Sequence, residues 1–328
     1  MVVSKKASFS VVLILLVFFL IYPLVVDAEA SYLVYFFYLT FVYVVLAQGW
    51  NLVAGYTGQV SLGQHAFFGV GSYITAITWN AGWTGYLDPL GMLMSGAGAA
   101  FLAIIVGIPL LAKLRGDYFA LGTLGLGEIL RVVCINGGSL TGGALGIGID
   151  SSGYQSMRPY YFIALLVAVM TLLFLWLVMR SNLGLALMAI REDETAAAAN
   201  GIATLKYKIF AFAAGAFVTG LCGSLNAYYI FHLHPAGVFS LNWAITPILM
   251  TILGGAGTFW GPILGAFVLA GVFELANIWM PELHPIFSGA FIILVTLFMP
   301  DGIMSFITGH KQRILQKLSP FNWLVRKT

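Results

Sequence analysis

The stretch YYFIALLVAVMTLLFLWLVM, Tyr160–Met179, decides the fold class. It runs for 20 residues without a charged side chain and lies between Arg158 and Arg180. A helix of this length spans about 30 Å, the thickness of the hydrocarbon core of a bilayer, and it satisfies its backbone hydrogen bonds internally. The sequence therefore predicts a membrane-spanning helix here.

The composition extends this expectation to the whole chain. Of its 328 residues, 60% are hydrophobic and 8% are charged, whereas a soluble protein carries about 25% charged residues. So few charges cannot solvate the surface of a soluble protein of this length. The formal net charge of +3 is also too small to indicate a nucleic-acid-binding protein.

Nine further apolar runs resemble the first. Together they predict an all-α integral membrane protein of about ten spans, namely Val11–Val26, Tyr32–Ala54, Gly63–Trp79, Met92–Ala112, Tyr118–Ile135, Tyr160–Met179, Tyr207–Phe231, Trp243–Leu253, Pro262–Trp279 and Leu283–Met299. The eighth run is short, and its start is expected nearer Phe239. With both termini in the cytoplasm, 13 of the 15 Lys and Arg residues lie inside, as the positive-inside rule requires.

The two ends of the chain carry separate expectations. Lys5 and Lys6, the first apolar run and Ala28-Glu29-Ala30 resemble a signal peptide with a cleavage site, but we favour an uncleaved first helix. Residues 1–310 are expected to form one membrane domain. The tail, 303–328, begins with Ile303–Leu318, which mixes apolar and basic residues as an interfacial helix on the cytoplasmic face does.

Two glycine-rich stretches interrupt the apolar pattern, each at a predicted cytoplasmic turn. They are GWNLVAGYTGQVSLGQHAFFGVGSY, Gly49–Tyr73, and GGAGTFWGPILG, Gly254–Gly265. Glycine at membrane depth permits either close helix packing or a wet pathway, and both interpretations stay open. Gly261 and Gly265 have the spacing of a close helix–helix contact, and the likeness of the two turns hints at a diverged internal repeat.

Polar and charged residues inside the spans are candidates for lining a transport pathway. Glu128 and Arg131 are three residues apart and are expected to form an ion pair on one helix face. Glu274 has no local partner and could face Arg131. The uncharged candidates lie between the end of the second span and the start of the third: Asn51, Gln59, Ser61, Gln64 and His65.

The longest predicted cytoplasmic stretch is Arg180–Tyr207. Its centre is rich in Ala, Leu, Met and Glu, which favours a helix that Asn182 begins and Gly201 ends. This helix is too polar to span the bilayer, and it carries the charge cluster Arg191–Glu194. A helix that docks on a cytoplasmic protein fits this pattern better than a solvated loop.

Other motifs are missing from the sequence. It has no Walker A motif, no nucleophile elbow and no HExxH motif, so no enzymatic activity is expected and any energy source lies in another chain or in an ion gradient. Cys134 and Cys222 lie in apolar runs and are interpreted as packing residues. His232 and His234 alone are weak evidence for a metal site, and no metal or cofactor is expected in this chain.

The chain resembles the permease subunits of branched-chain amino-acid ABC importers. The resemblance rests on motifs in a fixed order: Gly55–Tyr73, Arg115–Arg131, Thr141–Ile147, Ser181–Ile202, Ile252–Ala266 and the turn Met299–Gly302. It covers nearly the whole chain after the first helix. It implies a multi-pass permease of the bacterial inner membrane that works by alternating access.

The resemblance also implies partners and site residues. The partners are a second permease, two cytoplasmic ATPases that bind ATP and Mg, and a periplasmic or extracellular substrate-binding protein. Residues 182–202 match the family's coupling helix, which sits in a groove of the ATPase. The residues that fall on this motif are Arg191, Glu192, Asp193, Glu194, Ala197 and Gly201.

Two positions depart from the family pattern. Asn200 replaces an apolar residue before Gly201, and His65 replaces what is commonly alanine. Close relatives carry urea, short amides or aromatic acids, so these substrates stay open beside branched-chain amino acids. A stand-alone secondary transporter or channel is the alternative of another class, with Glu128, Arg131 and Glu274 as its titratable groups.

Overall fold

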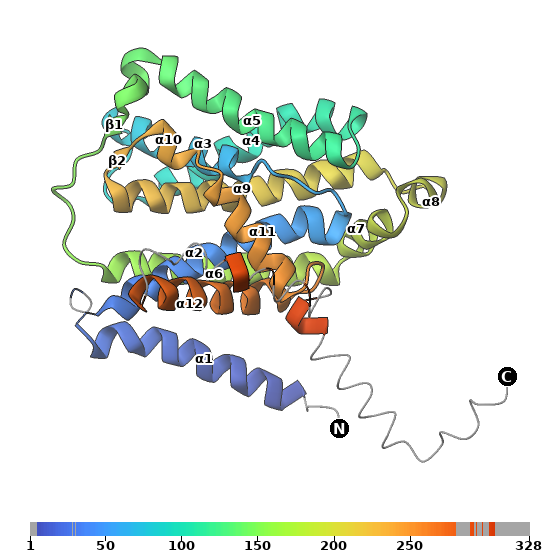
Figure 1. Ribbon diagram of the computed structural model, residues 1–328, viewed down its shortest axis with the longest axis horizontal. Coiled ribbons are helices and arrows are strands. Elements are labelled where there is room, and N and C mark those ends of the chain that lie inside the picture. The colour runs from blue at the N-terminus through green and yellow to red at the C-terminus, as the bar shows by residue number, and fades with distance from the viewer. Residues whose placement is uncertain are drawn as a thin grey trace.

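The computed structural model describes residues 5–27, 29, 31–279, 289–291, 293, 297 and 302–305. Most of this part is helical (Figure 1). The long helices are α1 (Lys5–Val25), α2 (Tyr32–Trp50), α3 (Gln64–Asn80), α4 (Pro89–Lys113), α5 (Asp117–Asn136), α6 (Arg158–Arg180), α9 (Thr204–Ile230), α11 (Asn242–Gly254) and α12 (Gly261–Trp279).

Shorter elements connect these helices. A π-helical turn, η1 (Asn51–Gly55), extends α2, and two 3-10 turns, η2 (Gly138–Leu140) and η3 (Gly143–Leu145), follow α5. The remaining short helices are α7 (Asn182–Glu192), α8 (Glu194–Ala199) and α10 (Pro235–Val238). Strands β1 (Ile147–Gly148) and β2 (His232–Leu233) pair antiparallel, with Ile147 opposite Leu233. This pairing joins the loop between α5 and α6 to the segment that follows α9.

Helix α9 lies at the centre of the bundle, where it packs along α3, α4 and α2. Helix α5 covers α3 at one edge, and α1 lies at the opposite edge beside α6 (Figure 1). Small residues permit the central contacts: a Cβ on Gly71 would collide with the backbone of Gly220, and one on Gly223 would collide with the backbone of Phe68. The close-packing interpretation of the first glycine-rich stretch is confirmed for Gly71.

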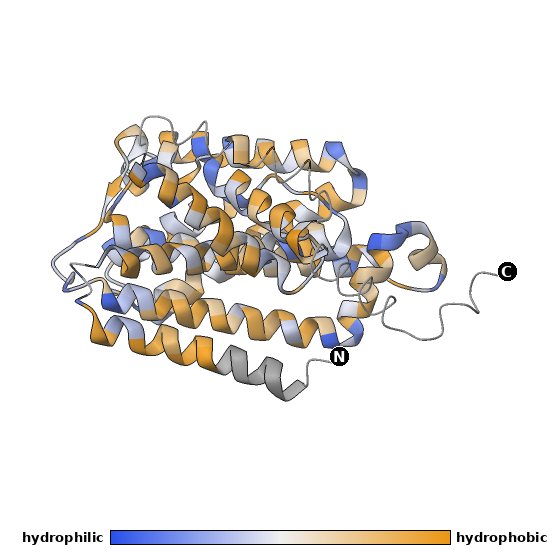
Figure 2. Ribbon diagram, turned by 60° about the horizontal axis from the view of Figure 1, so that its bottom comes forward, coloured by the Kyte–Doolittle hydropathy of each residue, from blue (hydrophilic) through white to orange (hydrophobic). Residues whose placement is uncertain are grey.

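Within the described part of the chain, seven helices are long and apolar enough to cross a membrane: Tyr32–Gly55, Pro89–Lys113, Asp117–Asn136, Arg158–Arg180, Thr204–Ile230, Pro235–Gly254 and Gly261–Trp279. Hydrophobic residues cover the flanks of the outer helices in Figure 2. The chain is therefore an all-α membrane protein. Nine of the ten predicted runs coincide with a helix, and the tenth, 283–299, lies mostly outside the described residues.

Some local expectations need correction. Ser181, rather than Asn182, caps α7, because its hydroxyl accepts from the Leu183 N–H at 3.2 Å. The eighth span does start before Trp243, as expected: the candidate span runs from Pro235 to Gly254, although a turn around Phe239 divides it into α10 and α11. Of the interfacial tail, only residues 303–305 are described.

The predictions about the cysteines and about the contact at Gly265 are confirmed. Both cysteines are free thiols, and Cys222 is fully buried. A Cβ on Gly265 would collide with the Met250 carbonyl, so the predicted close approach of α11 and α12 is present. The predicted internal repeat stays a prediction.

Candidate functional site

Helices α7 and α8 project from one end of the bundle (Figure 1). The predicted single coupling helix is two helices, because Asp193 is extended and interrupts it. The Asp193 carboxylate caps α8, accepting from the N–H groups of Thr195 at 2.7 Å and Ala196 at 3.0 Å. Glu192, the last residue of α7, takes no part in these capping hydrogen bonds. Its acidic side chain is exposed.

Apolar residues hold α7 against the bundle. Leu187 and Ile190 are buried, and Leu187 belongs to a cluster with Leu175 of α6 and Ala211 of α9. Ala197 is the buried residue of α8, while its other alanines are exposed. Gly201 follows α8 with φ +84°, as its predicted role in ending the helix requires.

Glu194 is anchored within the chain. Its carboxylate pairs with the Lys208 ammonium on α9 at 2.6 Å, and Lys208 also donates to the Leu111 carbonyl of α4 at 3.3 Å. The Lys208 side chain is only 3% exposed and Glu194 is 25% exposed. A buried ammonium needs such partners, so this ion pair fixes the base of α8 to α9 and α4.

Arg191, in the last turn of α7, lies against both glycine-rich turns. A Cβ on Gly257 would collide with the Arg191 guanidinium, and a Cβ on Gly58 would lie 3.7 Å from the Arg191 Cα. Gly58 and Gly257 both have positive φ, +72° and +78°, which favours glycine at both positions, and the close approach of Arg191 requires it at Gly257 as well. The end of α7 therefore rests on the two turns together.

The amide side chains of Gln48 in α2 and Asn51 in η1 bond to the backbone of the second glycine-rich turn. Asn51 accepts from the Gly257 N–H at 2.7 Å and donates to the Thr258 carbonyl at 3.0 Å. Gln48, one turn earlier, donates to the Phe259 carbonyl at 2.8 Å. Both side chains are fully buried, so the backbone of the second turn finds its partners on α2. We call this set, Gln48 and Asn51 with residues 257–259, the amide clamp.

The other predicted polar candidates lie inside the subunit around the first turn. Ser61 is buried and accepts from the Gly63 N–H at 3.2 Å, whereas Gln59 is partly exposed. Gln64 donates to the Leu46 carbonyl at 2.8 Å, and its Oε1 is buried without a partner among the described residues. His65 is fully buried against α5, where a Cβ on Gly127 would collide with its ring.

The charged candidates occupy two different edges of the bundle. Glu128 and Arg131 form the predicted ion pair on α5, at 2.8 Å, on a face that points away from the rest of the subunit. Glu274 lies on α12, which is at the opposite edge from α5 (Figure 1). Arg131 is therefore not its partner, and the Glu274 Oε1 atom has no hydrogen-bond partner among the described residues.

Two contributors to this site were not among the predicted residues. Gln48 could have been found, since it stands three residues before Asn51 on the same helix face. The burial of Lys208 had no sequence signal. Among the described residues, no group of three or more His, Cys, Asp or Glu side chains is arranged to hold a metal ion.

Comparison with known proteins places this arrangement in a family. The family described as "Branched-chain amino acid transport system / permease component" matches residues 32–296. The chain belongs to this family. It is accordingly a multi-pass membrane permease of the bacterial inner-membrane type rather than a member of an enzyme family.

Individual relatives of this permease carry two different names. The permease is 29% identical to LivM of Escherichia coli K12, a high-affinity branched-chain amino acid transport system permease protein, over 81% of this chain and 68% of LivM. It is 30% identical to LivM of Salmonella typhimurium over the same shares. It is also 24% identical to LivH of Salmonella typhimurium, over 80% of this chain and 91% of LivH. No solved structure matches it.

Proposed function

We propose that this permease is one of two related permease subunits in an ATP-driven importer of branched-chain amino acids. The observation that carries the proposal is the projecting pair α7–α8, which is exposed at its tip and joined at its base to both glycine-rich turns through Arg191. The printed names of the LivM and LivH relatives support the substrate class and the transport role.

ATP and Mg belong to two partner ATPases in this proposal. Glu192 and the exposed alanines of α8 present the docking surface, and Asp193, Ala197 and Gly201 shape it. When the ATPases close, they push α7, and Arg191 passes the displacement to Gly58 and Gly257. Because the amide clamp ties these turns together, α2 and the α11–α12 turn tilt as one unit.

The second permease is proposed to cover α5. The side chains of Glu128 and Arg131 are 48% and 36% exposed in a membrane-spanning helix, and facing lipid would cost several kcal/mol. Gly125, one turn earlier, has open space beyond its Cα, which permits a close neighbour. A related permease on this face would remove the ion pair from lipid and place it beside the cargo route.

The external side of the permease would receive the substrate-binding protein. The loop between α5 and α6 is held in place by the β1–β2 pair, and Glu29 accepts from the Met157 N–H at 2.8 Å. Ordered loops provide a surface on which a loaded binding protein can dock. Alternating access would then carry the cargo from this side to the cytoplasm.

Uptake of labelled leucine by the reconstituted importer in liposomes tests the proposal. We expect uptake that requires ATP and the binding protein, and that Glu192→Arg reduces at least tenfold by weakening ATPase docking. Arg115→Glu, a charge reversal at an exposed residue of the α4–α5 turn on the same side, is the matched control and should retain uptake.

Two outcomes would contradict the proposal. Uptake by the chain alone without ATP would favour a secondary transporter, in which Glu128, Arg131 and Glu274 are the titratable groups. Inhibition of leucine binding by urea, short amides or aromatic acids, with no leucine uptake, would reassign the substrate within the family.

A further inference from the structure

A cavity of about 690 Å³ lies between α2, α11 and α12. Most of its lining residues come from the first half of α2, the first half of α11 and the second half of α12, which share one end of the bundle, and Gly289 adds to the lining from beyond α12. In the predicted orientation this is the external half of the membrane. The amide clamp joins the same helices at their other ends, so the cavity is separate from the coupling region.

Glu274 places a carboxylate in the lining of this cavity. Its Oε1 atom is buried and has no hydrogen-bond partner among the described residues. The described lining contains no Lys, Arg or His side chain. A carboxylate at membrane depth that lacks a cationic partner is costly, and a ligand that brings a positive charge would relieve it.

Neutral polar groups lie near Glu274 in the same lining. Asn242 and Thr246 enter from α11, one turn apart, and Tyr43 enters from α2. These side chains can donate hydrogen bonds to a carboxylate, because amide N–H and hydroxyl groups are donors. Thr40 is committed elsewhere, since its hydroxyl donates to the Phe36 carbonyl at 2.7 Å.

The remaining wall is apolar. Phe36, Leu249 and Phe273 line the cavity between the polar groups. An aliphatic body fits such a wall, as in other ligand pockets that combine apolar walls with a few polar groups. The cavity thus offers a carboxylate, neutral donors and an apolar surface within one volume.

We propose that this cavity binds an apolar α-amino acid, with its ammonium on Glu274, its carboxylate on Asn242 and Thr246, and its side chain against the apolar wall. The inference rests on the proposed function and adds a binding site within the permease itself. An external cavity of this kind would hold cargo after its release from the binding protein.

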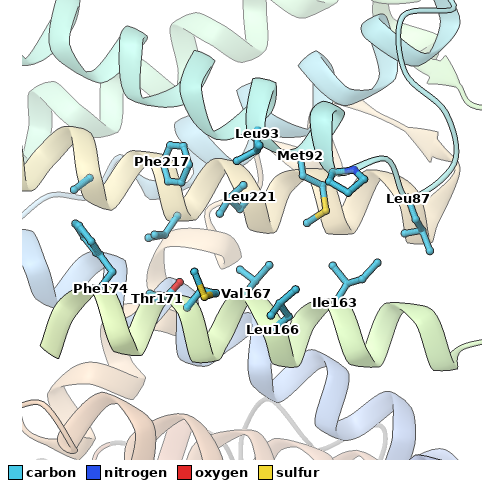
Figure 3. Close-up of a pocket in the computed structure, with 14 residues that line it drawn as sticks. Leu87, Met92, Leu93, Ile163, Leu166, Val167, Thr171, Phe174, Phe217 and Leu221 are labelled. Atoms are coloured by element: carbon cyan, nitrogen blue, oxygen red, sulfur yellow. The ribbon is translucent and has the colours of Figure 1, made fainter. Parts of the chain in front are cut away.

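A second cavity supplies the contrast. It has about 570 Å³ and lies between α4, α6 and α9, where Met92, Leu166, Phe217 and other apolar side chains face one another (Figure 3). Thr171 is the polar residue of its described lining, and no charged residue is among them. Apolar volume is therefore available elsewhere in the subunit, and the carboxylate distinguishes the cavity at Glu274.

Binding of three probes to the full-length chain in nanodiscs tests the inference. The probes are leucine, 3-methylbutan-1-amine, which lacks the carboxylate, and 4-methylpentanoate, which lacks the ammonium. We expect leucine to bind most tightly, the amine to bind measurably, and the acid to bind at least tenfold more weakly than leucine. Glu274→Gln should weaken the binding of leucine and the amine by about tenfold or more, since it removes a charge-assisted contact.

Asp150→Asn is the matched control, because it also replaces an acid by its amide but at an exposed external residue. It should leave the three affinities unchanged. If Glu274→Gln does not fold, Thr246→Val replaces it, with an expected loss for leucine and 4-methylpentanoate and none for the amine. Equal affinities of wild-type chain and folded variants for leucine, or no saturable leucine binding, would overturn the inference.

The two proposals fail in different measurements. If ATP-driven leucine uptake is intact and Glu274→Gln changes neither leucine binding nor uptake, the cavity is not a cargo site but the importer function stands. If uptake does not depend on ATP while Glu274 controls leucine binding, the site stands and the proposed energy coupling fails.

Discussion

Helices α2, α11 and α12 contact one another differently at the two ends of the bundle. At the end that carries the amide clamp, Gln48 and Asn51 bond to the backbone of residues 257–259, and Thr251 donates to the Ala47 carbonyl at 3.0 Å. At the other end, the same helices separate around a cavity in which a Glu274 oxygen has no partner among the described residues. One end is closed by hydrogen bonds and the other is open.

The difference indicates that the two ends of these helices have separate roles. A buried network whose polar groups are all paired resists deformation and transmits a push. A cavity with an unpaired charge has binding free energy available for a ligand. Changes at the closed end should therefore affect the free energy of unfolding, whereas changes at the open end should affect ligand affinity.

The largest loss of stability is expected for Glu194→Gln at the closed end. It leaves the Lys208 ammonium, which is 3% exposed, without its carboxylate. We expect the free energy of unfolding, measured by SDS titration in mixed micelles, to fall by about 3 kcal/mol. The double variant Glu194→Gln/Lys208→Met should recover most of this loss, and equal losses in single and double variants would contradict the role of the pair.

Asn51→Leu should have the next largest effect. It removes the partners of the Gly257 N–H and the Thr258 carbonyl, and we expect a loss of about 2 kcal/mol in the free energy of unfolding. Asn80→Leu is the control, because Asn80 makes one hydrogen bond, to the Gly148 carbonyl, on the surface. If both variants lose the same free energy of unfolding, the amide clamp stabilises the fold no more than a surface hydrogen bond does.

Gly257→Ala and Gly82→Ala sharpen the comparison further. Both glycines have similar positive φ, +78° and +73°, but Arg191 lies against Gly257 and nothing lies within 4 Å of a Cβ on Gly82. Both variants incur a similar backbone cost, so the difference in stability reports the contacts of a Cβ at 257 with the Arg191 guanidinium and the Gly55 carbonyl. We expect Gly257→Ala to be less stable than Gly82→Ala by about 1 kcal/mol. No difference in the unfolding midpoints would show that Arg191 does not rest on this turn.

The smallest change in stability is expected at the open end. Glu274→Gln keeps the shape of the side chain and removes an incompletely paired charge, so the free energy of unfolding should change by about 0.5 kcal/mol or less. A loss as large as that of Asn51→Leu, with unchanged affinity for leucine, would mean that Glu274 is structural and that the two ends do not differ.

The sequence predicted the features that depend on local spacing. Charge-free runs gave the helices, the i,i+3 spacing gave the Glu128–Arg131 pair, and alanine with acidic residues gave the projecting helices. The break at Asp193 was missed, because an aspartate within a helical pattern can either face solvent or cap a second helix.

Contacts between distant parts of the chain could not be predicted. Asn51 and Gly257 are 206 residues apart, and nothing in either segment indicates that they bond. The cavity at Glu274 likewise requires three helices whose arrangement periodicity does not encode. Lys208 had the pattern of an ordinary cytoplasmic lysine, although the fold buries it.

The link between the coupling helices and the two turns is tested most directly by Arg191→Ala in the reconstituted importer. Arg191 is the residue through which α7 contacts Gly58 and Gly257. We predict that the variant still assembles and still hydrolyses ATP, while ATP-driven leucine uptake falls at least tenfold and Arg115→Ala retains full uptake. Unchanged leucine uptake per ATP hydrolysed in Arg191→Ala would contradict the account.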